Sequence, residues 1–215
     1  MNKINRKKLA KDTWEALNEA FPDASCSLDY DAPERLAIRG ILSAQCMDVR
    51  VNITADELFG KYPSMKDICE ADEEELLSVI KPCGLYKSKG KAIRTFASLF
   101  ESKWGGKVPN DVDELMKCPG VGKKIANLIV GEVYGTPALV VDTHCKRVMY
   151  RIGLTDNTDP LKVEKDVCEV FPPREWISLG HLAVELGRTF CNAAKPSCES
   201  CPLTGFCMKR TGRNP

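Results

Sequence analysis

Four cysteines near the end of the chain have the spacing expected of ligands for a metal centre. Cys191, Cys198, Cys201 and Cys207 are separated by six, two and five residues, which include the loop-forming types proline, serine and lysine. Four thiolates can hold either a zinc ion or an iron–sulfur cluster. Only the middle two cysteines form the close pair that is usual in zinc sites. We therefore favour an iron–sulfur cluster and leave zinc open.

A second candidate for chemistry is the stretch of residues 115–142, where two glycines interrupt a helical pattern. Gly120, Val121 and Gly122 predict a sharp turn, and Lys123 and Lys124 open the helix that follows. The first N–H groups of a helix lack partners and lie at the positive end of its dipole, which suits a phosphate. Because cations are unfavourable at that end, the two lysines indicate a polyanion that offsets the cost.

The overall charge of the chain does not by itself indicate a partner. The 215 residues carry a net charge of +1, so a nucleic-acid footprint has to come from local clusters of basic residues. Such clusters occur in residues 3–11, 87–94, 117–124 and 146–151. Taken alone, each cluster is more often a solvated helix face.

The first residues and the cysteine count indicate the cellular compartment. No apolar run follows the basic residues at the start, and no stretch reaches membrane-spanning length, which excludes a secretory signal and a membrane protein. Eleven cysteines, an odd count, do not suit a disulfide framework. We expect a reduced, cytoplasmic compartment and treat the other seven cysteines as packing residues.

The elements that must position these residues are predicted to be helices. Pro33 suits a helical first turn, Asp72 an N-cap, and Asp111 with Glu114 a capping pair. Residues 138–141 are interpreted as an extended connector, and no alternating strands, repeats or low-complexity tracts are found, so the fold class is all-α. Further helices are predicted over residues 5–21, 33–42, 51–59, 72–80, 88–104, 123–133, 143–152, 160–170 and 174–191.

The cysteine spacing and residues 115–142 together resemble endonuclease III, a family of bifunctional DNA glycosylases with abasic-site lyase activity. The resemblance extends over residues 36–207 and rests on two independent motifs in the family's order. It implies a two-lobed helical DNA glycosylase with a helix-hairpin-helix and a C-terminal iron–sulfur cluster loop. Residues 26–136 would form a six-helix domain, and residues 1–25 with 137–215 the cluster domain. By this resemblance the four cysteines hold a [4Fe–4S] cluster.

The resemblance also assigns roles to residues at matching positions. Pro119 to Lys124 match the hairpin, which places the nucleophilic amine on Lys124, and Val141 to His144 match the segment whose essential aspartate is Asp142. Gln45 inherits the role of entering the gap left by an extruded nucleotide, and Leu85 that of an apolar wedge. The remaining DNA-binding residues by this match are Gly120, Val121, Gly122, Lys123 and His144. Taken singly, Lys124 would be a surface lysine and Asp142 a helix N-cap.

The implied reaction removes oxidised or ring-saturated pyrimidines from double-stranded DNA by base flipping and then cuts the strand at the abasic site. Attack by an amine on the sugar gives a Schiff base, which allows β-elimination, and a nearby carboxylate stabilises the positive charge. The base cannot be reached inside the stack, so the nucleotide must be extruded. The expected protein is a monomeric bacterial enzyme associated with the nucleoid, with damaged or abasic duplex DNA as partner and no membrane.

Some positions depart from the family pattern, and other functions compete. Cys46 and Met47 replace the more usual alanine and threonine, which puts the inherited base contacts in doubt, and the cluster loop carries a single cation, Lys195. Ile41 and Lys124 argue against the related adenine glycosylases, which place a glutamate at the first position and lack the lysine. The alternatives are shifted base specificity, a non-catalytic binder of DNA structure, and electron transfer through the cluster.

Overall fold

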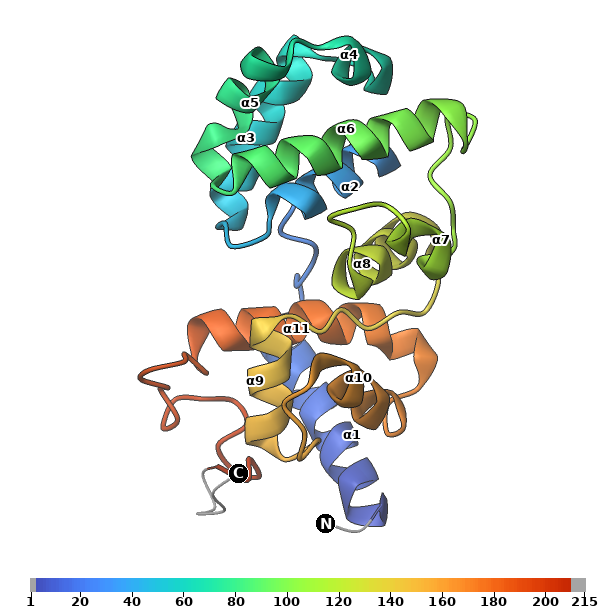
Figure 1. The fold of residues 1–215 in the computed structure, drawn as a ribbon. Helices are drawn as coiled ribbons and strands as arrows, with labels where there is room; N and C mark the ends of the chain where they lie inside the picture. Colours follow the sequence, from blue (N-terminus) through green and yellow to red (C-terminus); the bar gives the residue numbers. More distant parts are fainter. Residues whose placement is uncertain (1–2, 210–215) are drawn as a thin grey trace. The chain divides into compact units, whose positions relative to one another are not determined.

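The structure of the chain, a computed structural model, describes residues 3–209 and contains no strand among them (Figure 1). The expected all-α fold class is thereby confirmed. Because amphipathic helices need a partner surface to bury their apolar faces, the helices pack on one another. The helices are α1 (Lys3–Ala20), α2 (Pro33–Leu42), α3 (Asp48–Lys61), α4 (Met65–Glu70), α5 (Glu73–Ile80), α6 (Tyr86–Ser102), α7 (Val112–Met116), α8 (Lys123–Tyr134), α9 (Thr143–Ile152), α10 (Pro160–Cys168) and α11 (Trp176–Thr189), with 3-10 turns η1 (Lys81–Cys83) and η2 (Pro173–Glu175).

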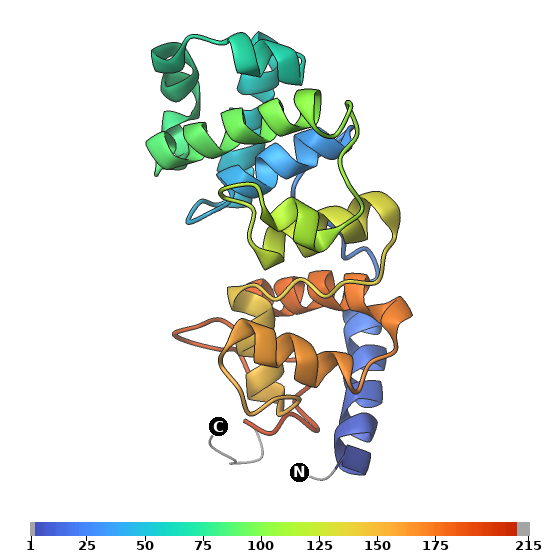
Figure 2. The same cartoon turned by 45° about the vertical axis from the view of Figure 1, so that its right-hand side comes forward.

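The chain divides into two compact units, one formed by a continuous segment and the other by two separate segments. One unit is the continuous segment Cys26–Thr136, and the other joins the described residues of Met1–Ser25 and Pro137–Pro215. The first unit therefore lies in the chain as an insertion between α1 and α9. The helices of each unit are seen from a second direction in Figure 2.

Helix α6 is the central element of the unit Cys26–Thr136. It packs against α2, α4, α5 and η1 (Figure 1). It buries Ile93, Phe96 and Ala97 on one stripe. Helix α8 packs against α2 and α7. The approach of α8 to α2 depends on Gly40, because a Cβ there would lie 2.9 Å from Cγ2 of Ile125. Residues 125–131 of α8 are all buried, so the accessible residues of this helix lie at its two ends.

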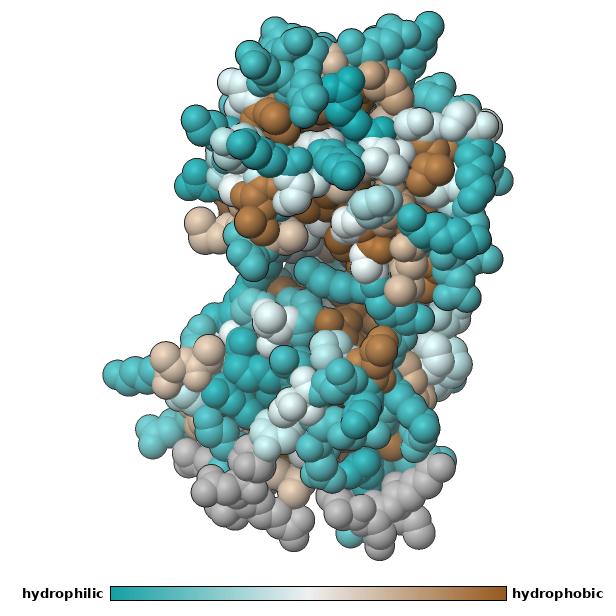
Figure 3. Space-filling view, in the orientation of Figure 1, coloured by the Kyte–Doolittle hydropathy of each residue, from teal (hydrophilic) through white to brown (hydrophobic). Residues whose placement is uncertain are grey.

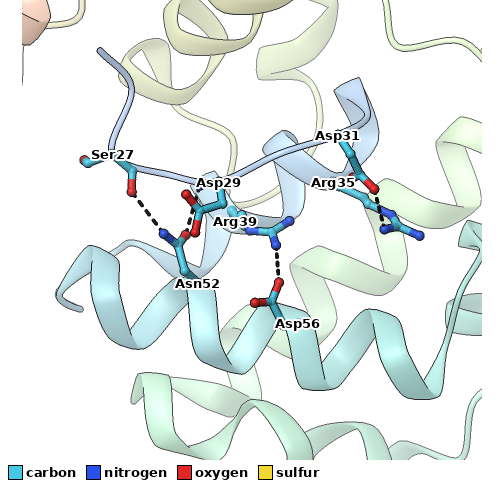
Figure 4. A network of polar contacts seen from close by, with 7 residues as sticks. All are labelled: Ser27, Asp29, Asp31, Arg35, Arg39, Asn52 and Asp56. Carbon is cyan, nitrogen blue, oxygen red and sulfur yellow. Dashed lines mark hydrogen bonds and ion pairs between the residues drawn. The ribbon is translucent and has the colours of Figure 1, made fainter. Parts of the chain in front are cut away.

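A polar network holds the start of this unit together (Figure 4). Asn52 of α3 donates to the carbonyl of Ser27 at 3.1 Å and accepts from the N–H of Asp29 at 3.1 Å, which ties the leading segment to α3. Arg39 of α2 is buried and pairs with Asp56 of α3 at 2.5 Å. These bonds fix α2 against α3 and therefore support the loop that joins them, residues 43–47.

The second unit has its own core, built on α11. Helix α11 packs against α1 and α9, and α10 packs against α9. The buried side chains include Leu17 of α1, Val148 of α9, Val167 of α10 and Leu182 of α11, so every helix contributes to one cluster. The segment that follows α11 returns to this cluster through Leu203. The positions of its cysteines are therefore determined by packing against this core.

The helix boundaries agree closely with the periodicity of apolar residues, with two differences. The structure has seven α-helices in Cys26–Thr136, where six were expected, because α4 was not predicted. This six-residue helix begins with a capping box in which Ser64 and Asp67 satisfy each other's backbone N–H groups. At α7 only half of the expected capping pair forms. Asp111 accepts from the N–H of Glu114 at 2.9 Å, whereas the Glu114 carboxylate bonds elsewhere.

The surface of each unit is mainly hydrophilic on the face shown in Figure 3. Within residues 3–209, no helix combines the length and the apolar content needed to cross a membrane. Among residues 3–209, seven large apolar side chains are nevertheless exposed, of which Met47 precedes α3 in the loop after α2 and Leu85 follows η1. The seven are Tyr30, Met47, Val49, Ile53, Leu85, Met116 and Leu161.

The two glycines of the hairpin turn have different roles. Gly120 has φ +83°, and a Cβ there would lie 2.7 Å from Cβ of Ala92 in α6. Gly122 is the extended N-cap of α8 with φ −87°, and a Cβ there would meet nothing within 4 Å. The predicted turn is present, and its positive φ lies at Gly120 and not at Gly122. Only Gly120 supplies a conformation and a close approach that other residues cannot.

We predict that the same substitution at these two positions has opposite consequences. Gly120→Ser should lower the free energy of unfolding by roughly 1–3 kcal/mol, because the side chain is strained at positive φ and collides with Ala92. Gly122→Ser should change it by less than about 0.5 kcal/mol or increase it, because serine is a preferred N-cap. Urea unfolding of both variants measures the difference. Equal losses at the two positions would contradict this account of the turn.

Candidate functional site

The turn between α7 and α8 presents a lysine to solvent. Lys124 is exposed in the first turn of α8, whereas Lys123 beside it is half-buried. Val121 is 3% exposed, and its N–H donates to the Cys118 carbonyl at 3.0 Å. The structure therefore places Val121, expected among the DNA contacts, as an anchor inside the turn. The turn therefore leaves the amine of Lys124 exposed to solvent.

Glu114 fixes the helix that leads into this turn. Its carboxylate accepts from Lys103 at 2.5 Å, from Lys117 at 2.6 Å and from Trp104 at 3.2 Å. Hydrogen bonds from Lys103, then Lys117 and Trp104, lower the pKa of Glu114 to about 2. The two lysines compensate the carboxylate, so this network joins the end of α6 to α7.

We predict a pH-dependent contribution of Glu114 to stability. The pKa of Glu114 is below its ordinary value of 4.5 in the folded chain, so the stabilisation is full above pH 4.5 and is lost as the pH falls toward 2. Glu114→Gln should therefore be less stable than the wild type at pH 7 and equal to it near pH 2, as measured by urea unfolding across this range. Asp113→Asn, which alters an exposed neighbouring acid, is the control. A constant difference at every pH would count against the network.

Two loops of the same unit carry the residues predicted to enter DNA. Gln45 follows α2 and Leu85 follows η1, and both side chains are exposed, Leu85 at 53%. Their φ values are +54° and +49°, and no other residue besides glycine has a positive φ within residues 3–209. Such conformations persist only where the surroundings impose them, and they cluster at functional sites. The two residues selected by resemblance are thus the two strained positions.

A lysine that sequence reasoning missed connects these loops. Nζ of Lys89 lies 2.8 Å from the carbonyl oxygen of Leu42 and 2.8 Å from that of Cys83, and the residue is 4% exposed. A signal was present in the sequence, since Lys89 lies four and seven residues before Ile93 and Phe96 on the apolar stripe of α6. A lysine on a buried stripe needs polar partners inside the protein.

Asp142 is the N-cap of α9 in the second unit. Its Oδ1 accepts from the N–H of Cys145 at 2.7 Å. Asp142 therefore caps the helix, as its residue type and position alone predict. No other hydrogen bond to this carboxylate is found in the part of the chain that the structure describes. Because one oxygen suffices for the cap, the carboxylate is oriented by the helix and keeps Oδ2 for another partner.

His144 is held by an arginine of its own helix. Nη2 of Arg147 lies 3.0 Å from Nδ1 of His144, and because a guanidinium only donates, Nδ1 is the acceptor and Nε2 carries the proton. The ring also packs closely against α11, since a Cβ on Gly187 would lie 2.7 Å from Nδ1. His144 was expected among the DNA-binding residues, and its contacts here join α9 to α11.

The four cysteines predicted to bind a metal centre line one pocket. The pocket encloses about 400 Å³ when open solvent is included, and its other walls include Ile152, Leu186, Phe190 and Leu203. Burial raises the pKa of the Cys201 thiol against the opposing effect of the Leu203 N–H, and charge on the other three cysteines raises it further. The four sulfurs therefore share one neighbourhood.

The arrangement of the thiols bears on the kind of metal centre. Within residues 3–209, no three His, Cys, Asp or Glu side chains converge closely enough to hold a single metal ion. A zinc ion needs four ligand atoms within about 2.3 Å of one point, whereas a cluster takes its thiolates on separate iron atoms. The four thiols line the walls of a pocket and do not converge on one point.

Two further arginines missed by sequence reasoning hold the cysteine loop. Nε of Arg147 donates to the Cys191 carbonyl at 2.9 Å, and Arg151 donates to the carbonyls of Asn192 at 2.7 Å and Ala193 at 2.9 Å. Nη1 of Arg151 also lies 3.6 Å from Sγ of Cys191. The two arginines are four residues apart and share one face of α9. Their spacing of four residues indicates a shared helix face. It does not indicate what they bind, because the loop lies some forty residues away in sequence.

Comparison with known proteins identifies the family of this chain. Residues 38–173 match the HhH-GPD superfamily of base excision DNA repair proteins. The chain belongs to this superfamily. Endonuclease III of Bacillus subtilis is 39% identical over 201 residues, which cover 93% of this chain and 92% of that protein. Endonuclease III of Synechocystis sp. is 36% identical over 204 residues, covering 94% and 93%.

Solved structures agree with this assignment. A trapped endonuclease III–DNA covalent intermediate is similar to this HhH-GPD protein with a TM-score of 0.92 and 38% identity, over 99% of both chains. A thermostable thymine-DNA glycosylase shares the fold with a TM-score of 0.81 and 23% identity. The predicted resemblance to endonuclease III, the helical glycosylase fold and the enzyme class, DNA glycosylase and abasic-site lyase, are thus confirmed.

Proposed function

We propose that this HhH-GPD protein excises oxidised or ring-saturated pyrimidines from duplex DNA through Lys124 and then nicks the strand at the abasic site. The observation that carries the proposal is that Lys124 is exposed in the first turn of α8. This helix follows a tight turn whose backbone conformation and close packing require glycine at position 120. The similar endonuclease III structure is a trapped covalent intermediate with DNA, which supports covalent chemistry of this kind. We propose the bacterial nucleoid as its place of action.

Asp142 is the proposed acid partner of Lys124. The two residues belong to different units, and each lies at the N-terminal end of a helix. Helix α9 orients the carboxylate through Oδ1 and leaves Oδ2 for the reaction. There it can stabilise positive charge on the sugar or accept the proton that the amine loses.

The proposed reaction accounts for each bond. Nζ of Lys124 bonds to C1′ as the N-glycosidic bond breaks, and the base leaves with the electron pair and takes up a proton. The C1′–O4′ bond then breaks and O4′ takes up a proton. This leaves an iminium between Lys124 and C1′, which acidifies the hydrogen on C2′. Loss of that proton expels the 3′ phosphate by cleavage of the C3′–O bond. Water then hydrolyses the iminium and frees the lysine.

Gln45 and Leu85 are proposed to fill the gap that the extruded nucleotide leaves. Extrusion costs a few kcal/mol, which a gap-filling amide and an apolar wedge can offset. Both side chains are exposed at the tips of their loops. Met47 is 71% exposed beside Gln45, so an apolar side chain lies where the family pattern has threonine. We propose that Met47 shifts the preference among damaged bases. The backbone of Gly120 and Gly122, with Lys123, is proposed to bind phosphate at the start of α8.

We also propose that the four-cysteine pocket holds a [4Fe–4S] cluster. The residues fit this group, because four thiols surround one pocket with apolar walls and Arg151 donates toward Cys191. When bound, the cluster supplies a covalent link among the four cysteines and a centre capable of electron transfer. The unit of α1 and α9–α11 is accordingly the proposed cluster domain, and Cys26–Thr136 the domain of the hairpin.

Borohydride trapping tests the role of Lys124. Wild-type protein mixed with abasic duplex DNA and borohydride should give a covalent adduct, because hydride reduces the iminium to a stable amine. Lys124→Ala should give none, while Lys107→Ala, an exposed lysine of the same unit, should give as much as the wild type. Asp142→Asn keeps a good N-cap and should slow base release roughly a hundredfold or more.

The possible results separate the competing functions. Base release without an adduct would make the enzyme monofunctional and would exclude the role given to Lys124. Binding of abasic DNA with neither base release nor an adduct would leave the non-catalytic binder of DNA structure as the function.

The metal content of cysteine variants tests the cluster. Cys201→Ala should lose iron, acid-labile sulfide and visible absorption, because the pocket then has three thiols. Cys69→Ala, which lies on α4 outside the pocket, should keep all three. Purified wild-type protein that contains zinc and no iron would overturn the assignment.

A further inference from the structure

Helix ends next to the two strained loops share one cation. Leu42 is the last residue of α2, three positions before Gln45, and Cys83 is the last residue of η1, two positions before Leu85. The carbonyls at the end of a helix lack intrahelical partners and lie at the negative end of the dipole. Nζ of Lys89 bonds to both carbonyls at 2.8 Å. A single ammonium therefore satisfies both helix ends and joins the backbones that lead into the two loops.

Lys89 also contacts the second loop through its own backbone. Its N–H donates to the Leu85 carbonyl at 3.0 Å, and the Ser88 hydroxyl donates to the same oxygen at 2.9 Å. Leu85 is thus held at the start of α6 in a left-handed conformation. Lys89 thus bonds to the backbone next to both loops, through Nζ at Leu42 and Cys83 and through its N–H at Leu85.

The surroundings of Lys89 suggest that stability alone does not account for a lysine here. Burial lowers its pKa, and the groups that oppose this effect are the thiols of Cys83 and Cys46. In the part of the chain that the structure describes, no carboxylate bonds to its Nζ. Burying an ammonium costs free energy, which neutral carbonyl partners offset only in part. Methionine would fill this space without that cost, but it would leave the two carbonyls unconnected.

We propose that Lys89 is a positioning residue that holds the Gln45 and Leu85 loops in register, so that both side chains enter the duplex together when the nucleotide is extruded. This inference rests on the proposed function. It assigns the coupling of the two loops to an amine that does not touch DNA.

Comparing two substrates distinguishes the positioning role of Lys89 from a general contribution to stability. Extrusion from a paired duplex requires both loops to displace the stack, whereas an abasic nucleotide in a single strand is already accessible. Loss of Lys89 should therefore impair the duplex reaction and spare the single-strand reaction. A merely structural role would impair both to the same extent.

Single-turnover kinetics of Lys89→Met test the proposal. Base release from a duplex with thymine glycol should slow by about tenfold to about a hundredfold, since small misplacements have effects of this size. Cleavage of a single-stranded abasic oligonucleotide should stay within about twofold of the wild type, because Lys124 is unaltered. Lys91→Met removes an exposed charge from the same helix and should match the wild type on both substrates. If Lys89→Met does not fold, Lys89→Gln is measured in the same way.

A double-mutant cycle adds a second readout. If Lys89 acts through the loops, combining Lys89→Met with Gln45→Ala and Leu85→Ala should slow duplex base release little more than the loop variants alone. Equal slowing on duplex and single strand, wild-type rates on both, or full additivity would each overturn the proposal.

Failure of the proposed function can be distinguished from failure of this inference. If wild-type protein forms no borohydride adduct, the chemistry assigned to Lys124 is wrong. Insertion of the loops can then still be measured, from the fluorescence of 2-aminopurine placed opposite an uncleavable abasic analogue. The wild type should change that fluorescence more than Lys89→Met does, and equal changes would overturn the role of Lys89 whatever the chemistry.

Discussion

The close approach of the hairpin turn to α6 is the constraint on which the hairpin unit depends. Gly120 lies where any Cβ would collide with Ala92, so the turn rests directly on α6. The same helix carries Lys89 one turn earlier, where it bonds to the ends of α2 and η1. One helix thus positions the turn that presents Lys124 and the two loops that carry Gln45 and Leu85. The buried face of α6 contacts the hairpin turn and the ends of α2 and η1, which lie far apart in the sequence.

Several side chains to which a role is proposed are fixed by backbone groups that lack partners within a helix or loop. Asp142 satisfies an N–H at the start of α9, and Lys89 satisfies carbonyls at the ends of α2 and η1. The arginines of α9 do the same for the carbonyls of the cysteine loop. Since a buried or partly buried backbone group needs a partner, the requirement that folds these segments also orients their side chains.

Local features were predictable from the sequence, and long-range contacts were not. The Asp142 cap and the turn at Gly120 follow from residue types within a few positions, and the structure contains both. Helix α4 was missed because it is only six residues long, although Ser64 and Asp67 have the spacing of a capping box. The bonds of Lys89 to Leu42 could not be foreseen, because they join residues 47 positions apart. Resemblance selected Gln45 and Leu85, but their strained conformations became evident only in the structure.

The amine and the acid proposed for the reaction occupy electrostatically opposite situations. A carboxylate at a helix N-terminus is favoured by the dipole and accepts a backbone hydrogen bond, so Asp142 stabilises α9 as it stands. An ammonium at the same end of a helix is disfavoured, and within residues 3–209 no hydrogen bond of this kind holds Lys124 in the first turn of α8. In the proposed complex, phosphates of the DNA bind at this helix end and offset the unfavourable charge there. The proposed nucleophile is exposed to solvent before the DNA binds. The acid, in contrast, is oriented before the substrate arrives.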